Sequence, residues 1–168
     1  TGFDLFLGLQ EHHTELRFDD GADTAGGEGE GHIFQLGHEF ASLHPAHKTT
    51  FGGTGTLLYG AKIGLEKAVP DVRRKGLRTP AVLVCSDRAH YACLTVANWL
   101  GLGEESIVQI PTTDDNQMIV TELGPRLREV VASGRRIACI VATMGTTDAF
   151  GLDDLAGIVR VRDEIVKT

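Results

Sequence analysis

The sequence lacks the features that mark three large classes of protein. Its basic residues form no run longer than Arg73-Arg-Lys75 and the formal net charge is −7, so the basic surface of a nucleic-acid binder is missing. No segment reaches the roughly 18 consecutive apolar residues of a membrane span. No charged-then-apolar leader opens the chain, so no signal peptide is expected. We therefore expect a cytoplasmic protein that binds neither nucleic acid nor membrane.

Cysteine is also scarce, and its pattern argues against a disulfide framework. The three cysteines are widely spaced in apolar surroundings, at Cys85, Cys93 and Cys139. We expect them to be reduced core residues. His38-Glu39 begins like a zinc-protease motif, but Ser42 stands where the second His is required, so no metal site is expected.

The length of 168 residues, with 42% hydrophobic content, fits one domain or a piece of a larger one. The chain begins at Thr1 and stops at Thr168 inside a helical pattern, which indicates a fragment. Residues 1–49 contain an acidic glycine-rich stretch at 21–31, expected to be a loop, and a pattern that suggests a short helix over 32–43. They carry no further motif and form an unassigned N-terminal segment.

The most distinctive stretch is the glycine-rich segment 51–60, Phe-Gly-Gly-Thr-Gly-Thr-Leu-Leu-Tyr-Gly. Its first glycines carry no Cβ, so backbone N–H groups can come close to a ligand. Thr54 and Thr56 are expected to cap a helix over about 54–68. The first N–H groups of a helix lack internal partners and lie at the positive end of its dipole, which suits a phosphate. The alternative is a glycine turn that merely starts a helix.

Two familiar phosphate motifs do not fit this segment. A Walker A loop needs a Lys directly after its second Gly, where this chain has Ala61. A dinucleotide fingerprint needs a third Gly where Leu58 stands. Both motifs expect a hydrophobic strand upstream, and residues 44–50 do not form one. The remaining hypothesis is a phosphate held at a helix N-terminus that no strand precedes.

Apolar runs and helical patterns alternate along the rest of the chain. Strands are predicted at 81–85, 107–110 and 136–142, and helices at 91–100, 120–132 and from 153 to the end. Since the connections are too long for hairpins, we predict βαβ units, a mainly parallel sheet and an α/β layered fold. Ligands of such sheets bind beyond the carboxyl ends of the strands, where the polar loops 86–90 and 143–148 fall. Together with the helix start at 53–56, these loops are expected to converge on one pocket.

Three motifs, in this order, resemble one enzyme family. They are Gly52-Gly-Thr54, Ser86-Asp-Arg-Ala-His-Tyr91 and Val141-Ala-Thr-Met-Gly-Thr-Thr-Asp148. The chain resembles the group II pyridoxal-phosphate-dependent amino-acid decarboxylases, which include the glutamate, tyrosine and aromatic amino-acid decarboxylases and have the fold type I (aspartate aminotransferase-like) architecture. The resemblance covers about residues 50–168. It implies that this part is a partial large domain that binds pyridoxal 5'-phosphate.

The resemblance implies a phosphate site in the glycine-rich segment. Gly53 and Thr54, with Gly55, match the positions that hold the cofactor phosphate. Leu57 departs from the pattern, since the family often has Asn or another polar residue near this position.

The resemblance also implies residues that contact the rest of the cofactor. His90 matches the catalytic histidine that stacks on the pyridine ring, and a flat imidazole suits that contact. Thr143 matches a threonine beside the cofactor, and Thr146 and Thr147 shape the same loop. The alternatives are a surface histidine at a helix start and a simple turn hydroxyl.

Such an enzyme further needs a lysine that bonds covalently to its cofactor and an acid paired with the pyridinium nitrogen. By resemblance both belong beyond Thr168, and Lys48, Lys62 and Lys67 lie in no matching motif.

The activity implied for the complete protein is removal of the α-carboxylate of an amino acid as CO2, in amino-acid and other carboxylic acid metabolism. We expect it to be a homodimer, and the 168-residue chain alone to be inactive. Another fold type I enzyme, such as a phosphate-ester lyase or a desulfurase, and a non-catalytic α/β binding module are the alternatives. The sequence does not indicate which amino acid is the substrate.

Overall fold

The computed structural model describes residues 6–8, 14–18, 32–36, 52–146 and 149–167. The loop expected at 21–31, the pair His38-Glu39 and Thr147 lie outside these ranges. In the described part, no helix is both long and apolar enough to cross a membrane.

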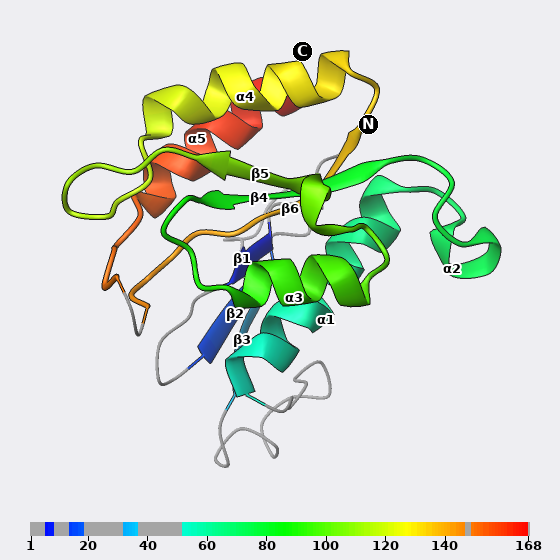
Figure 1. The fold of residues 1–168 in the computed structure, drawn as a ribbon, viewed down its shortest axis with the longest axis horizontal. Helices are drawn as coiled ribbons and strands as arrows, with labels where there is room; N and C mark the ends of the chain where they lie inside the picture. Colours follow the sequence, from blue (N-terminus) through cyan, green and yellow to red (C-terminus); the bar gives the residue numbers. More distant parts are fainter. Residues whose placement is uncertain (1–5, 9–13, 19–31, 37–51, 147–148, 168) are drawn as a thin grey trace, which may run out of the picture.

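The centre of the molecule is a three-stranded parallel sheet with the order β5-β4-β6 (Figure 1). Its strands are β4 (Ala81–Ser86), β5 (Ile107–Ile110) and β6 (Arg136–Ile140). Every residue of the central strand β4 is buried. The continuous apolar run predicted this, because both faces of such a strand are covered by helices. The predicted α/β class and parallel sheet are confirmed, although β6 ends two residues earlier than expected.

One face of the sheet is covered by α1 (Gly52–Ala68) and α3 (Ala92–Trp99). Successive side chains of a strand point to opposite faces, so Leu83 and Cys85 of β4 pack with these two helices in one buried cluster.

The other face is covered by α4 (Val120–Ala132) and α5 (Leu155–Val166), as Figure 1 shows. Val82 and Val84 of β4 pack there with the buried residues of both helices. The prediction of α4 is confirmed at both ends. Because each connection between these strands crosses back through a helix, the strands of the sheet are parallel.

α1 and β6 approach each other closely at Gly64. A Cβ added to Gly64 would overlap the carbonyl oxygen of Ala138. The pairing of β4 with β6 shifts register between Val82 and Leu83, which leaves Ala138 as the extra residue of a bulge. A glycine in α1 is therefore required by packing at this point.

The remaining elements differ from the sequence predictions. β1 (Phe6–Gly8), β2 (Thr14–Phe18) and β3 (His32–Leu36) form an antiparallel sheet beside α1. The helix predicted over 32–43 is therefore wrong over 32–36, because this stretch pairs with β2 as an antiparallel strand.

Two further short helices complete the described part. α2 (Val72–Lys75) lies in the charged connector before β4, and a 3₁₀ turn (Glu104–Ser106) precedes β5.

Candidate cofactor site

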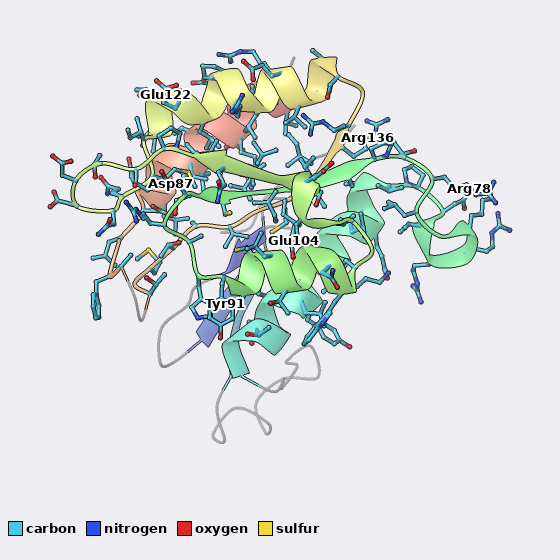
Figure 2. The ribbon with its side chains drawn as sticks, viewed as in Figure 1. Arg78, Asp87, Tyr91, Glu104, Glu122 and Arg136 are labelled. Carbon is cyan, nitrogen blue, oxygen red and sulfur yellow. The ribbon has the colours of Figure 1, made fainter. Side chains whose placement is uncertain are left out.

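The predicted site segments lie at the carboxyl edge of the parallel sheet. β4 and β6 are parallel neighbours, so the loops that follow Ser86 and Ile140 leave the same edge. α1 runs against the strand direction, and its first turn lies at this end too (Figure 1). Figure 2 shows Asp87 and Tyr91, which flank the predicted histidine, at this end, and Arg136 at the opposite one.

The glycine-rich segment is the first turn of α1. The helix begins at Gly52, whose φ of +77° makes the turn, so Thr54 and Thr56 lie inside the helix and the prediction that they cap it is wrong. The Thr56 hydroxyl instead donates to the carbonyl oxygen of Gly52 at 3.2 Å. Gly53 and Thr54 are half-buried and Gly55 is buried. The first turn contains no acidic residue, which leaves its positive end electrostatically open to an anion.

His90 is fixed at the start of α3 by one of its ring nitrogens. The backbone N–H of Ala92 donates to its Nδ1 at 3.0 Å, so the imidazole acts as the helix cap. Because Nδ1 accepts, the neutral ring carries its proton on Nε2. The ring of Tyr91 lies 4.1 Å from that of His90, centroid to centroid, with 31° between their planes. The half-buried imidazole is therefore held in place before any ligand binds.

Thr143 and Thr146 are buried in the β6–α5 loop, residues 141–154. The N–H of Thr143 donates to Oδ2 of Asp153 at 2.6 Å, and its carbonyl oxygen accepts from the N–H of Asp153 at 2.8 Å. The Thr146 hydroxyl oxygen accepts from the N–H of Ala149 at 2.9 Å. Both predicted threonines thus belong to a loop braced by its own hydrogen bonds.

Asp153 has a role that the sequence did not indicate. The sequence predicts that Asp153 starts the last helix, but the N-cap is Asp154, whose Oδ1 accepts from the N–H of Gly157 at 2.9 Å. Asp153 is only 5% exposed, and its Oδ1 accepts from the N–H of Met118 at 2.7 Å. Burial raises the pKa of its carboxyl group, against the lowering effect of the two backbone hydrogen bonds. Two adjacent aspartates before a helix give no signal of which one caps it.

The β5–α4 loop, residues 111–119, is hydrogen-bonded to the β6–α5 loop. The side-chain amide of Asn116 donates to the carbonyl oxygen of Ala149 at 2.9 Å, and that of Gln117 to the carbonyl oxygen of Leu152 at 2.7 Å. These residues read in sequence as an ordinary polar turn, since their partners lie more than thirty positions away in the chain.

Ser86, the last residue of β4, carries an unusual hydroxyl. It is 1% exposed, and its Oγ is the one buried side-chain polar atom in the described part that has no hydrogen-bond partner. Unpaired buried polar atoms are rare and mark either strain or a site that receives a polar partner. This atom lies at the carboxyl end of β4, from which the loop that carries His90 leaves.

The described residues offer no metal site, and two of the three cysteines have raised thiol pKa values. No group of three His, Cys, Asp or Glu side chains there could hold a metal ion. All three cysteines are free and buried. A hydrogen bond with Cys93, and then burial, raise the pKa of Cys85, and burial raises that of Cys139. Neither of these thiols is an activated nucleophile.

The comparisons with known proteins agree with the fold. Residues 58–166 match the family described as "Pyridoxal-dependent decarboxylase conserved domain". The chain is 28% identical over 130 residues to L-2,4-diaminobutyrate decarboxylase of Acinetobacter baumannii, covering 68% of this chain and 26% of that protein. It is 34% identical over 112 residues to acidic amino acid decarboxylase GADL1 of Xenopus tropicalis, covering 64% and 22%.

A solved structure supports the same relationship. Mouse CSAD in its apo form superposes with a TM-score of 0.64 at 28% identity, over 67% of this chain and 24% of that one. The sheet and its helices therefore have the architecture of a fold type I pyridoxal-phosphate enzyme. The chain belongs to the pyridoxal-dependent decarboxylases, and pyridoxal phosphate is the cofactor of this family. It spans about a quarter of the length of the relatives it matches.

The residues at the edge fit this cofactor chemically. A helix start without acidic residues suits the phosphate. An oriented imidazole suits the ring. The unpaired Ser86 hydroxyl leaves a polar atom at the same edge that a ligand or a water can satisfy.

Proposed function

We propose that the complete protein containing this chain is a pyridoxal-phosphate-dependent amino-acid decarboxylase, which removes an α-carboxylate as CO2 to give an amine. The observation that supports this most is the family match over residues 58–166, which spans two of the three predicted site segments. The relatives named above include decarboxylases of an acidic and of a diamino acid. We therefore propose an amino acid as the substrate class and leave its side chain open.

The proposed cofactor contacts come from three segments at the carboxyl edge of the sheet. The first turn of α1, at Gly53, Thr54 and Gly55, holds the phosphate through backbone N–H groups and a hydroxyl. His90 lies against the ring. Thr143 and Thr146 form the wall beside it.

Each residue contributes a separate physical effect. When bound, pyridoxal phosphate supplies an electron sink for the charge left by the departing carboxylate. The α1 dipole offsets the charge of the phosphate. His90 covers one side of the ring and keeps a proton on Nε2, which is free of the capping bond and able to donate to a substrate or cofactor oxygen. The covalent lysine and the acid for the ring nitrogen are proposed to come from the rest of the protein.

We further propose that the complete protein is a cytoplasmic homodimer. The support is the family's usual organisation together with three free, buried cysteines, which suit a reducing compartment.

The test is a decarboxylase assay on the purified complete protein, with acidic, basic and aromatic amino acids offered in turn. CO2 release that stops when pyridoxal phosphate is removed and returns when it is added back would support the proposal. Cofactor binding without CO2 release from any of these amino acids would favour another fold type I chemistry. Absence of cofactor binding would leave a non-catalytic module.

A further inference from the structure

The buried carboxylate of Asp153 joins two loops that leave different strands. Oδ2 accepts from the N–H of Thr143, just beyond β6, and Oδ1 accepts from the N–H of Met118, which lies in the β5–α4 loop. The N–H of Asp153 returns a third hydrogen bond to the carbonyl oxygen of Thr143. Thr143 is therefore held at both of its backbone polar groups by one residue.

The contacts around this carboxylate brace the same two loops. Asn116 and Gln117 donate from the β5–α4 loop to carbonyl oxygens of the β6–α5 loop. A Cβ added to Gly151 would overlap the carbonyl oxygen of Asn116, so the two backbones are in direct contact. The Thr112 hydroxyl extends the network to Asp87, in the loop that carries His90, at 2.8 Å.

Two loops can pack together without a buried carboxylate, so the presence of one at Asp153 needs a further explanation. Burying a carboxylate is unfavourable unless its oxygens are hydrogen-bonded. Each oxygen here meets one backbone N–H, an arrangement that a neutral amide cannot reproduce, because an amide offers one acceptor and one donor. The Asp153 carboxylate is thus buried at a cost in free energy, and its two oxygens fix the backbone at Met118 and Thr143.

We propose that Asp153 is a positioning residue for the cofactor site: it fixes the Thr143 backbone, and with it the wall beside the cofactor ring, relative to the β5–α4 loop. This inference rests on the proposed function. Asp153 touches neither cofactor nor substrate in this proposal and acts only through Thr143 and Met118.

The test compares Asp153→Asn with Asp154→Asn in the complete protein. Both substitutions remove one negative charge at neighbouring positions, but Asn at 154 still caps α5. Three properties are measured: the melting temperature, the circular dichroism of bound pyridoxal phosphate, which reports ring orientation, and kcat/KM for CO2 release. Val130→Ala, on the buried face of α4, serves as a variant that loses stability away from both loops.

We expect Asp153→Asn to change the cofactor dichroism and to lower kcat/KM by about a hundredfold, as misplacement of a site by about 1 Å can do. Asp154→Asn and Val130→Ala should leave the dichroism as in the wild type. Asp153→Asn with wild-type dichroism and kcat/KM, and only a lower melting temperature, would overturn the proposal.

A second variant covers the case in which Asp153→Asn does not fold. Gln117→Ala removes an exposed tie between the same loops, and should shift the dichroism in the same direction by a smaller amount. No shift in that variant would count against the proposal. If the wild type itself neither binds pyridoxal phosphate nor releases CO2, the proposed function fails, and the positioning role fails with it for that separate reason.

Discussion

Gly64 of α1 lies directly against the carbonyl oxygen of Ala138 in β6, with no room for a Cβ between them. The contact holds α1, whose first turn is the proposed phosphate site, at a fixed distance from the sheet. A side chain here would push helix and strand apart.

Gly64→Ala should therefore lower the free energy of unfolding by about 1–3 kcal/mol, the usual cost of overpacking a core. The measurement is denaturant unfolding followed by far-ultraviolet circular dichroism. Gly124→Ala is the control, because its methyl would meet other side-chain atoms at 3.5 Å or more. We expect that change to alter stability by no more than about 1 kcal/mol. Equal effects at the two sites would contradict the packing argument.

His90 combines two roles that two substitutions can separate. Asn is a good N-cap, so His90→Asn should retain a partner for the Ala92 N–H while removing the ring. His90→Ala loses both. We expect both variants to bind pyridoxal phosphate more weakly, and only His90→Ala to lose about 1 kcal/mol of stability as well. Titration with the cofactor and thermal unfolding measure the two effects. If His90→Asn binds pyridoxal phosphate as tightly as the wild type, His90 does not contribute to binding by stacking on the ring.

Ser86→Ala tests the unpaired hydroxyl at the end of β4. Because the buried Oγ has no partner in the described part, its removal relieves a desolvation cost. Without cofactor, we expect the variant to be as stable as the wild type or more stable by about 1 kcal/mol. If the hydroxyl pairs with the cofactor or with its bound water, the same variant should show weaker cofactor binding. A clear loss of stability without cofactor would mean that the hydroxyl has a structural partner.

Phe150 is a strained residue at the surface of the β6–α5 loop. Its φ is +54°, and its side chain is 76% exposed. A left-handed conformation costs a bulky residue about 1–2 kcal/mol that glycine does not pay. Phe150→Gly should therefore raise the melting temperature. Phe150→Ala, which removes the ring but keeps a Cβ, should give little gain. If both raise it equally, the exposed ring and not the backbone is responsible.

Asp153 should make stability depend on pH. Its pKa is higher in the folded than in the unfolded chain, mainly because of burial, so the folded state holds the proton more tightly. The stabilisation from this group is fully present below the unfolded aspartate value of about 3.9 and is lost as pH rises through the folded-state pKa. The stability difference between wild type and Asp153→Asn should shrink over that rise. Denaturant unfolding at several pH values measures this stability difference. A difference that grows with pH would mean that folding lowers the pKa of Asp153 and would contradict the prediction.

The sequence predicts most of the sheet and helices because their signals are local. The run from Ala81 to Cys85 is apolar throughout and too short for an ordinary helix, which favours a doubly buried strand, and the helix over Val120–Ala132 has its own periodicity. The sequence predicts the start of α1 two residues late, because Gly52 and Gly53 are typical of a turn and not of a helix.

The site is predicted less completely, since its supporting contacts are long-range. His90 and Thr143 stand in motifs that can be recognised, and they remain predictions as cofactor contacts. Asn116 and Asp153 have partners in another loop, which no local pattern reveals. The antiparallel pairing that turns His32–Leu36 into a strand is likewise set by a neighbour and not by its own residues.

The buried cysteines have one more consequence. Cys85, Cys93 and Cys139 are 2%, 4% and 0% exposed and lie in the same packed layer between the sheet and the helices α1 and α3. A thiol reagent can reach them only when that layer opens. The rate at which each sulfur is alkylated therefore measures how often this part of the protein unfolds locally. The protein thus carries, without any engineered label, a reporter of how often the layer beneath its glycine-rich helix separates from the sheet.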